Sequence, residues 1–514
     1  MIEQRFGDSD VGDVVTPAPG APALASTPAE RRPVLVAAIL ASSMGFIDGS
    51  VISIAIPAIR ADLGATLADA QWISNGYLLF LSSLILLGGA AGDRFGLRNM
   101  FGLGIAVFVV ASMVVALAPT PLVLVIARAV QGAGAAFMVP GSLAIIAKAY
   151  PREVRGRAIG IWAAASSLTS IGGPIIGGFV LTWFGQASWR LIFAINLPLG
   201  AAALALLWFK VRADVPEAGR RLDLVGAVLA SLALMLIAYG LTGDGSESTP
   251  PLSHMGLYAG SGIIVAVLFL VWEARAQAPM LPLRLFAIRA FSGANALTFA
   301  LYFALGGAMF FLPMTLIAGW GVSPAEVALA LLPLGILLTI LSSFSGVMAD
   351  RFGPAPLIAV GSVLVALAFG LLGWTTPLHN VRLAVLPCVA LLGLGMGMVV
   401  SPLSTAVMTA VDDSDTGVAS GVNNAVARVA GLMAVALLGL VVASVFEQSL
   451  GSAAELPIFF GMAAPGLSAG DEALRLAATD AAFASVAYIT AVLSLISAAI
   501  AWWTLERQPV RTAV

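Results

Sequence analysis

The sequence Gly92-Asp93-Arg94-Phe95-Gly96 joins two long apolar segments, and a similar sequence, Ala349-Asp350-Arg351-Phe352-Gly353, occupies the same setting later in the chain. In each sequence a glycine permits a tight turn between two helices. Two equivalent halves are typical of many membrane transporters, whose substrate site lies between the halves near the middle of the bilayer. The repeated turn therefore predicts a chain of two related helical halves.

The chain around these turns is too apolar for a water-soluble globule. Of its 514 residues, 60% are hydrophobic and only 10% are charged, and the mean hydropathy is +1.01. Soluble domains are on average about half apolar and about a quarter charged. A lipid bilayer removes the cost of exposing so much apolar surface. The composition therefore indicates an integral membrane protein.

A helix that crosses the bilayer needs about 20 predominantly apolar residues. Fourteen segments of the chain meet this requirement. They lie near residues 34–57, 70–91, 100–118, 121–148, 157–183, 189–209, 223–243, 255–273, 291–318, 323–347, 355–375, 381–410, 416–445 and 481–504. The predicted fold class is therefore all-α, with fourteen transmembrane helices.

The helices predicted at 223–243 and 255–273 distinguish fourteen spans from twelve. Without them, the two similar turns occupy matching positions in two sets of six helices. The predicted organisation is a disordered cytoplasmic tail at 1–33, a six-helix half at 34–209, a linker with two additional helices at 210–290, a second six-helix half at 291–506 and a cytoplasmic tail at 507–514. Residues 447–480, rich in Gly, Ala, Ser and acidic residues, are expected to form a flexible external loop.

The basic residues are distributed unevenly over the loops. Cytoplasmic loops of membrane proteins carry an excess of Lys and Arg. With the N-terminus in the cytoplasm, nineteen of the 25 Lys and Arg fall on the cytoplasmic side and two within helices. The four external ones are Arg60, Arg190, Arg382 and Arg475. This asymmetry predicts that both termini are cytoplasmic, as an even number of helices requires.

Two charged residues are expected deep in the membrane, where charges are costly and therefore mark functional sites. Asp48 lies about 13 Å from the outer end of its helix and Arg128 about 10 Å from the outer end of another. Burial favours the protonated form of an acid, and a nearby arginine favours the ionised form. An acid between these influences can take up and release a proton, although a static ion pair is the alternative interpretation.

Glycines and a proline stand out at two further places. In Gly89–Arg98, Gly96 permits the turn, Arg94 and Arg98 can hold the cytoplasmic surface, and Asp93 can cap a neighbouring helix N-terminus. In Gly172–Gly178, Pro174 bends the helix, and the glycines allow another helix to approach closely. These segments favour a gating turn and a helix that moves between states, although ordinary loop charge and packing are the alternatives.

No constellation of catalytic or metal-binding residues is evident. One cysteine and two histidines exclude a disulfide framework and a zinc site built from them. The acidic run Asp412–Asp415 has no second acidic cluster in a matching loop, so it is interpreted as a turn that caps the next helix. We therefore expect a protein that is not an enzyme and has no metal or organic cofactor.

Several of these segments resemble motifs of the major facilitator superfamily, specifically its fourteen-helix drug:proton antiporter branch. Gly89–Arg98 resembles the cytoplasmic motif between helices two and three, Arg128–Gly134 the fourth-helix motif, and Gly173–Gly178 the fifth-helix antiporter motif. Asp48–Pro57, Trp189–Gly200 and Gly417–Gly431 resemble signatures of the fourteen-helix branch. The resemblance covers about residues 34–510.

The sequence departs from these motifs at four positions. Leu97, Pro354 and Ala355 stand where the superfamily usually has basic residues, and Thr169 replaces an earlier glycine of the fifth-helix motif. The departures at Pro354 and Ala355 predict that the second turn, with Asp350 and Arg351, is a weaker latch or one that acts from one side only.

The resemblance implies proton-coupled export of small lipophilic compounds, as in multidrug or antibiotic efflux, by alternating access. It ties Asp48 and Arg128 to proton coupling, Gly89, Asp93, Arg94, Gly96, Arg98, Asp350 and Arg351 to the cytoplasmic gate, and Gly173, Pro174, Gly177 and Gly178 to the helix bend. We expect the apolar cavity to be lined by Trp72, Tyr77, Gln131, Asn295, Tyr302 and Met396.

The expected partners are a lipophilic substrate, neutral or singly charged, protons and the lipid bilayer, with no nucleic acid and a monomeric state. The expected location is the inner or plasma membrane, with the proton gradient as energy source. Import of a nutrient by symport and translocation of a lipid remain alternatives.

Overall fold

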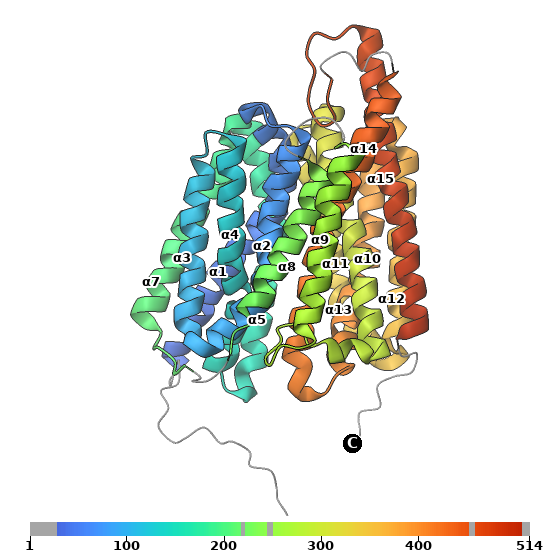
Figure 1. Cartoon of the computed structure of the whole chain (residues 1–514). Coiled ribbons are helices and arrows are strands. Elements are labelled where there is room, and N and C mark those ends of the chain that lie inside the picture. Colours follow the sequence, from blue (N-terminus) through green and yellow to red (C-terminus); the bar gives the residue numbers. More distant parts are fainter. Residues whose placement is uncertain (1–27, 217–220, 244–249, 452–457, 506–514) are drawn as a thin grey trace, which may run out of the picture.

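The computed structural model describes residues 28–216, 221–243, 250–451 and 458–505, which form a bundle of helices (Figure 1). The first half comprises α1 (Pro28–Leu63), α2 (Leu67–Phe95), α3 (Leu97–Ala116), α4 (Pro121–Ala149), α5 (Arg152–Phe184), α6 (Trp189–Ala194) and α7 (Asn196–Lys210). Next come α8 (Leu224–Thr242) and α9 (Leu252–Glu273). The second half comprises α10 (Arg289–Met314), α11 (Pro324–Phe352), α12 (Pro354–Thr375), α13 (Leu386–Thr409), α14 (Thr416–Leu450) and α15 (Ala469–Thr504).

The described residues contain 14 helical segments long and apolar enough to cross a membrane. α6 and α7 together form one of them, Gln186–Lys210. The predicted number of spans and the all-helical class are therefore confirmed.

The repeated turns have the same backbone conformation. α2 and α11 are each 29 residues long and end at Phe95 and Phe352. The next residues, Gly96 and Gly353, have φ values of 92° and 79°. Only glycine adopts this region at little cost. Each turn can therefore reverse the chain within one residue.

The prediction of a loop over the whole of 447–480 is wrong. α14 continues to Leu450, and α15 already begins at Ala469. The reason is local: the Ser468 hydroxyl caps the backbone N–H of Asp471, and two acidic residues stand in the first turn, where the helix dipole favours them. α1 likewise begins at Pro28 rather than at residue 34. The rest of the predicted tails, residues 1–27 and 507–514, lies outside the described residues.

The two additional helices lie against the seam between the halves. α8 packs against both α2 and α14, and the Ser231 hydroxyl on α8 donates to the Ser83 hydroxyl on α2 at 2.9 Å. α9 packs on α8 and exposes most of its apolar side chains. α8 thus covers a junction between halves, and α9 is placed to face lipid.

The halves meet at the end of the bundle opposite the start of α1. There Gln71 donates to the Val435 carbonyl at 2.6 Å and Arg60 to the Phe460 carbonyl at 2.5 Å. The N–H of Ala325 donates to the Thr182 hydroxyl at 3.0 Å. We call this region the closed end and the other the open end.

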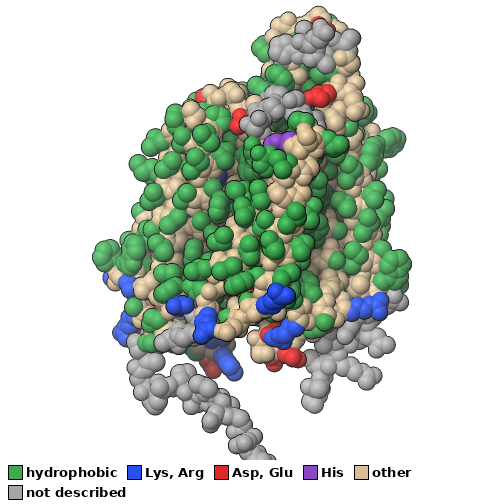
Figure 2. Space-filling model, in the orientation of Figure 1, with side chains coloured by type: hydrophobic (Ala, Val, Ile, Leu, Met, Phe, Trp, Pro, Cys, Tyr) green, Lys and Arg blue, Asp and Glu red, His purple; other side chains and the backbone are tan. Residues whose placement is uncertain are grey.

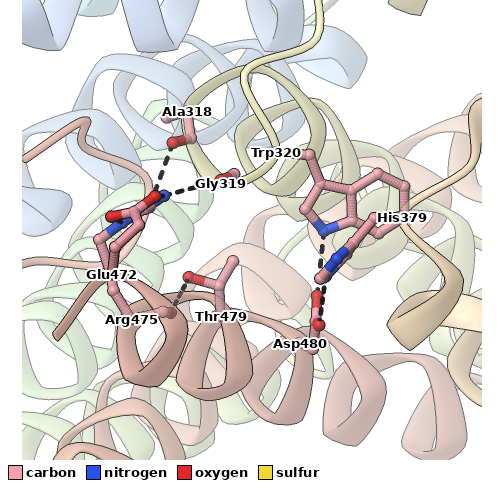
Figure 3. Close-up of polar contacts among 8 residues, drawn as sticks. All are labelled: Ala318, Gly319, Trp320, His379, Glu472, Arg475, Thr479 and Asp480. Carbon is pink, nitrogen blue, oxygen red and sulfur yellow. Dashed lines mark hydrogen bonds and ion pairs between the residues drawn. The ribbon is translucent and has the colours of Figure 1, made fainter. Parts of the chain in front are cut away.

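Two polar clusters brace the second half at its closed end (Figure 3). Asp480 accepts hydrogen bonds from the indole N–H of Trp320 at 3.0 Å and contacts Nε2 of His379 at 2.6 Å. Nearby, Arg475 pairs with Glu472 at 2.7 Å and donates to the Gly319 carbonyl at 2.9 Å. These contacts join α15 to the segments that follow α10 and α12.

Charged side chains are segregated on the surface. Apolar side chains cover the middle of the visible face, and Lys and Arg gather at the open end (Figure 2). An apolar band between polar ends is the surface that a bilayer requires.

Candidate functional site

A cavity of about 1560 Å³ lies between the two halves. Its mouth at the open end includes Asp93, Arg221, Asp223, Arg284 and Asp415. Its deep wall includes Tyr77 and Arg128 from the first half and Tyr302 and Arg428 from the second. Most substrate sites are concave and largely apolar, with a few polar groups that fix orientation. The cavity has this character and enters the membrane region from one side only.

Asp48 and Arg128 form a buried ion pair at the deep end of this cavity. Nη1 of Arg128 lies 2.5 Å from Oδ2 of Asp48, and both residues are only 1% exposed. Nε of Arg128 donates to the Ile73 carbonyl at 3.2 Å, and the guanidinium lies 4.4 Å from the ring centroid of Tyr77. The structure thus brings together the two deep charges that the sequence singled out.

A chain of polar side chains extends from Asp48 away from the cavity. Gln131 donates to Oδ1 of Asp48 at 2.9 Å and to the Ser112 hydroxyl at 2.8 Å. Asn196 donates to the same hydroxyl at 3.2 Å. All four residues are buried, and Oδ1 of Asn196 has no hydrogen-bond partner. Ser112 is not marked in the sequence by charge or motif position, whereas Asn196 lies within the Trp189–Gly200 segment.

The six residues expected in the cavity have different surroundings. Tyr77 and Tyr302 line it, whereas Gln131 lies behind the wall in the Asp48 network. Asn295 is buried and donates to the Phe291 carbonyl, and Met396 is buried in the apolar core of the second half. Trp72 lies towards the closed end, where its indole N–H donates to the Gly243 carbonyl.

The first of the two repeated turns is held by an aspartate from outside the motif. The carboxylate of Asp214 accepts from the N–H groups of Leu97 and Arg98 at 2.9 and 3.0 Å and pairs with Lys148 at 2.9 Å. Burial opposes ionisation of Asp214, but the hydrogen bonds from Arg98, Lys148 and Leu97 outweigh it and lower the pKa of the carboxyl below its usual value. Asp214 therefore caps α3, and Asp93 lines the cavity.

Arg98 completes this turn by holding a second helix. Its guanidinium donates to the carbonyls of Leu207 and Trp208 at 3.2 and 2.9 Å. Cations are favourable at the C-terminal end of a helix, where carbonyls lack partners. One turn thus fixes the start of α3 and the end of α7. In the second turn, Asp350 and Arg351 are exposed.

The glycines of α5 lie where neighbouring helices approach closely. A Cβ on Gly173 would lie 2.6 Å from the Ser50 hydroxyl, and one on Gly177 would lie 2.2 Å from the Val51 side chain, both on α1. A Cβ on Gly178 would lie 2.6 Å from the Pro324 carbonyl oxygen of α11. α5, which contains Pro174, therefore packs through small residues against both halves.

Comparison with known proteins identifies the family. The model of the Major Facilitator Superfamily matches residues 38–435. The chain belongs to this superfamily. It is 33% identical over 414 residues to the tetracenomycin C resistance and export protein of Streptomyces glaucescens, covering 80% of this chain and 76% of that protein. It is also 33% identical to the methylenomycin A resistance protein of Bacillus subtilis, covering 81% and 89%.

Solved structures of other proteins share the superfamily fold. A bacterial homologue of the human lysosomal transporter Spinster, in an inward-facing and occupied conformation, matches with a TM-score of 0.68 and 16% identity, covering 93% of this chain and 97% of that one. A D-xylose–proton symporter matches with a TM-score of 0.60 and 15% identity, covering 93% and 98%. This facilitator is thus a multi-pass membrane transporter, and it adds α8 and α9 to two six-span halves.

Proposed function

We propose that this facilitator exports small lipophilic compounds in exchange for protons, by alternating access. The observation that carries the proposal is the buried Asp48–Arg128 pair at the deep end of a cavity that opens on one side. Relatives named for resistance to or export of antibiotics, at about one-third identity, support export as the direction. The fifth-helix glycine–proline motif also favours export over nutrient symport.

We assign the open end to the cytoplasm. Lys148, Arg152, Arg155 and Arg157 cluster there around the start of α5, and cytoplasmic ends of membrane proteins carry such an excess. Both termini are then cytoplasmic, and the conformation faces inward. The location that follows is the inner or plasma membrane.

In the coupling cycle, Asp48 alternates between its ion pair with Arg128 and a bound proton. Arg128 holds the ionised carboxylate in the inward-facing state, while substrate enters the cavity. Protonation from the outside removes the charge of Asp48 and weakens its contacts with Arg128 and Gln131. The polar chain through Ser112 and Asn196 supplies hydrogen-bonding groups along which that proton can arrive. Release of the proton to the cytoplasm then restores the pair.

The proton gradient supplies enough free energy for this exchange. One charge crossing a potential of about 100 mV releases about 2.3 kcal/mol. Since about 1.4 kcal/mol corresponds to a tenfold ratio, one proton per neutral substrate maintains a gradient of roughly fifty-fold. No other cofactor is required, and one chain contains both halves, so a monomer suffices.

Transport into inside-out vesicles with an acidic interior tests the proposal. Three fluorescent compounds, one neutral, one anionic and one cationic, are followed with and without the pH gradient. We expect accumulation that collapses with the gradient and that Asp48→Asn abolishes, because asparagine cannot exchange a proton. Glu326→Gln removes an exposed acid at the closed end and is the control. Gradient-driven transport by Asp48→Asn at the wild-type rate would exclude this coupling role. If the wild type accumulates the compounds only when the gradient is reversed, the result favours symport.

A further inference from the structure

A cation without an acidic partner lines the deep part of the cavity. Arg428 lies twelve positions after the start of α14 at Thr416, which places it about 18 Å along the helix. Its side chain is partly buried and faces the cavity. In the described part of the chain its guanidinium makes no ion pair, and its Nε has no hydrogen-bond partner.

The other deep charges of the cavity cancel each other. Asp48 and Arg128 are paired at 2.5 Å. At the mouth, Arg284 is paired with Asp415 at 2.6 Å. The deep cavity therefore carries one net positive charge, on Arg428. A charge at this depth is costly unless something compensates it, so the site favours a ligand that brings a negative charge.

A line of polar residues leads from the mouth to this cation. Ser420, Asn424 and Arg428 are spaced four residues apart on α14, and all three line the cavity. This spacing places side chains above one another on one helix face. Beside Arg428 the wall is aromatic, with Tyr77 from one half and Tyr302 from the other. A guanidinium offers up to five N–H donors in a fork that matches a carboxylate or sulfonate.

We propose that Arg428 binds the acidic group of the exported compound, so that the preferred substrates are lipophilic monoanions. The apolar body of such a compound lies against Tyr77 and Tyr302, and its carboxylate, sulfonate or phenolate pairs with the guanidinium. A lipophilic dication meets the uncompensated positive charge instead and is disfavoured. This inference deepens the proposed export function and rests on it in taking the bound compound to be the exported substrate. The binding site itself does not depend on transport.

Two probes that differ only in the acidic group test the proposal. 8-Anilinonaphthalene-1-sulfonate is a monoanion, and N-phenyl-1-naphthylamine is the same aromatic body without the sulfonate. Binding is measured by fluorescence titration of the full chain in nanodiscs of zwitterionic lipid, with the signal of empty nanodiscs subtracted. We expect Arg428→Gln to weaken binding of the sulfonate by about tenfold or more and to change binding of the neutral amine by less than about threefold.

Two further variants separate charge recognition from damage to the cavity. Arg428→Lys keeps the charge and should retain sulfonate binding within about fivefold of the wild type. Arg382→Gln removes the same charge from an exposed side chain outside the cavity and should leave the binding of both probes within about threefold. Equal loss of both probes in Arg428→Gln, or unchanged sulfonate binding, would overturn the proposal.

Competition identifies where the natural anion comes from. If phosphatidylglycerol added to the nanodiscs displaces the sulfonate, the natural anion is a lipid headgroup. If a water-soluble aromatic carboxylate displaces the sulfonate and phosphatidylglycerol does not, the natural anion is a free compound. Failure of both to compete would overturn the anion site. Because no gradient is present, a failed coupling test with Asp48→Asn leaves these results unaffected, and failed binding leaves the coupling test unaffected.

Discussion

Gly178→Ala should shift the facilitator from its present conformation towards one in which the closed end separates. Gly178 lies on α5 where that helix meets α11 of the other half. A Cβ at this position would lie 2.6 Å from the carbonyl oxygen of Pro324 and 2.8 Å from Cβ of Ala328. The first is a backbone atom and cannot rotate away. The closed end must therefore separate to admit one methyl group.

The magnitude of this shift follows from the cost of overpacking. Inserting a methyl group into a well-packed contact costs about 1–3 kcal/mol. A state in which α5 and α11 separate at this end does not contain the contact and does not bear the cost. The equilibrium should therefore shift by a factor of about 5 to 150. Gly172→Ala is the matched control, because a Cβ on Gly172 would meet no atom within 4 Å.

Spin-label distances report which end is open. Cys388 is the single cysteine and is replaced first, so that labels can be introduced at chosen sites. Labels at Gln186 and Leu378, exposed near the closed end of each half, should move apart in Gly178→Ala. Labels at Arg157 and Asp413, exposed at the open end, should move together.

The control decides how the distances are interpreted. Gly172→Ala should reproduce both wild-type distance distributions. If Gly178→Ala leaves both distributions unchanged while the protein remains folded, the α5–α11 contact does not govern closure. If both variants shift alike, the effect comes from added helix propensity on α5 and not from the contact with Pro324.

Two further predictions concern stability. In denaturant titrations, Asp214→Asn should lower the free energy of unfolding by about 1.5–3 kcal/mol, whereas Asp413→Asn, at an exposed position, should stay near the wild-type value. Because the pKa of Asp214 is lowered in the folded state, the contribution of this carboxylate to stability should be constant from pH 8 to 5. It should disappear only as the pH falls through that lowered pKa. His379→Gln and Asp480→Asn should show a coupling energy of about 1 kcal/mol in a double-mutant cycle of thermal unfolding, because Asp480 contacts both His379 and Trp320; additive effects would contradict that contact.

Much of the fold could be predicted because lipid imposes simple requirements on sequence. Apolar segments of sufficient length identify the spans, and both repeated turns place a glycine after a phenylalanine where φ is positive. The start of α15 was missed for a physical reason. Its first turns, with Asp471 and Glu472, are polar because they lie beyond the apolar core, so a hydropathy criterion assigns them to a loop.

The candidate site could be predicted only where it involves buried charge. Asp48 and Arg128 are conspicuous because each is costly alone, and their pairing follows from similar depth. Asp214 gives no such signal, since it stands in a loop among basic residues and becomes a helix cap only when α3 and α4 meet there. Gln131 was expected in the cavity but lies behind its wall, because spacing along α4 does not tell which of two inward faces meets solvent.

The structure connects the proposed proton site with α5, the helix predicted to move between states. The α1 segment on both sides of Asp48 is also the surface on which α5 packs, since Gly173 faces Ile47 and Ser50, and Gly177 faces Val51. A change in the contacts of Asp48 therefore acts on backbone that touches α5 without intervening side chains. Close-packed interfaces transmit small shifts because they have no space to absorb them. Gly178 lies on the same helix, at its contact with α11. A change in the contacts of Asp48 is therefore transmitted through α5 to the α5–α11 contact at the closed end.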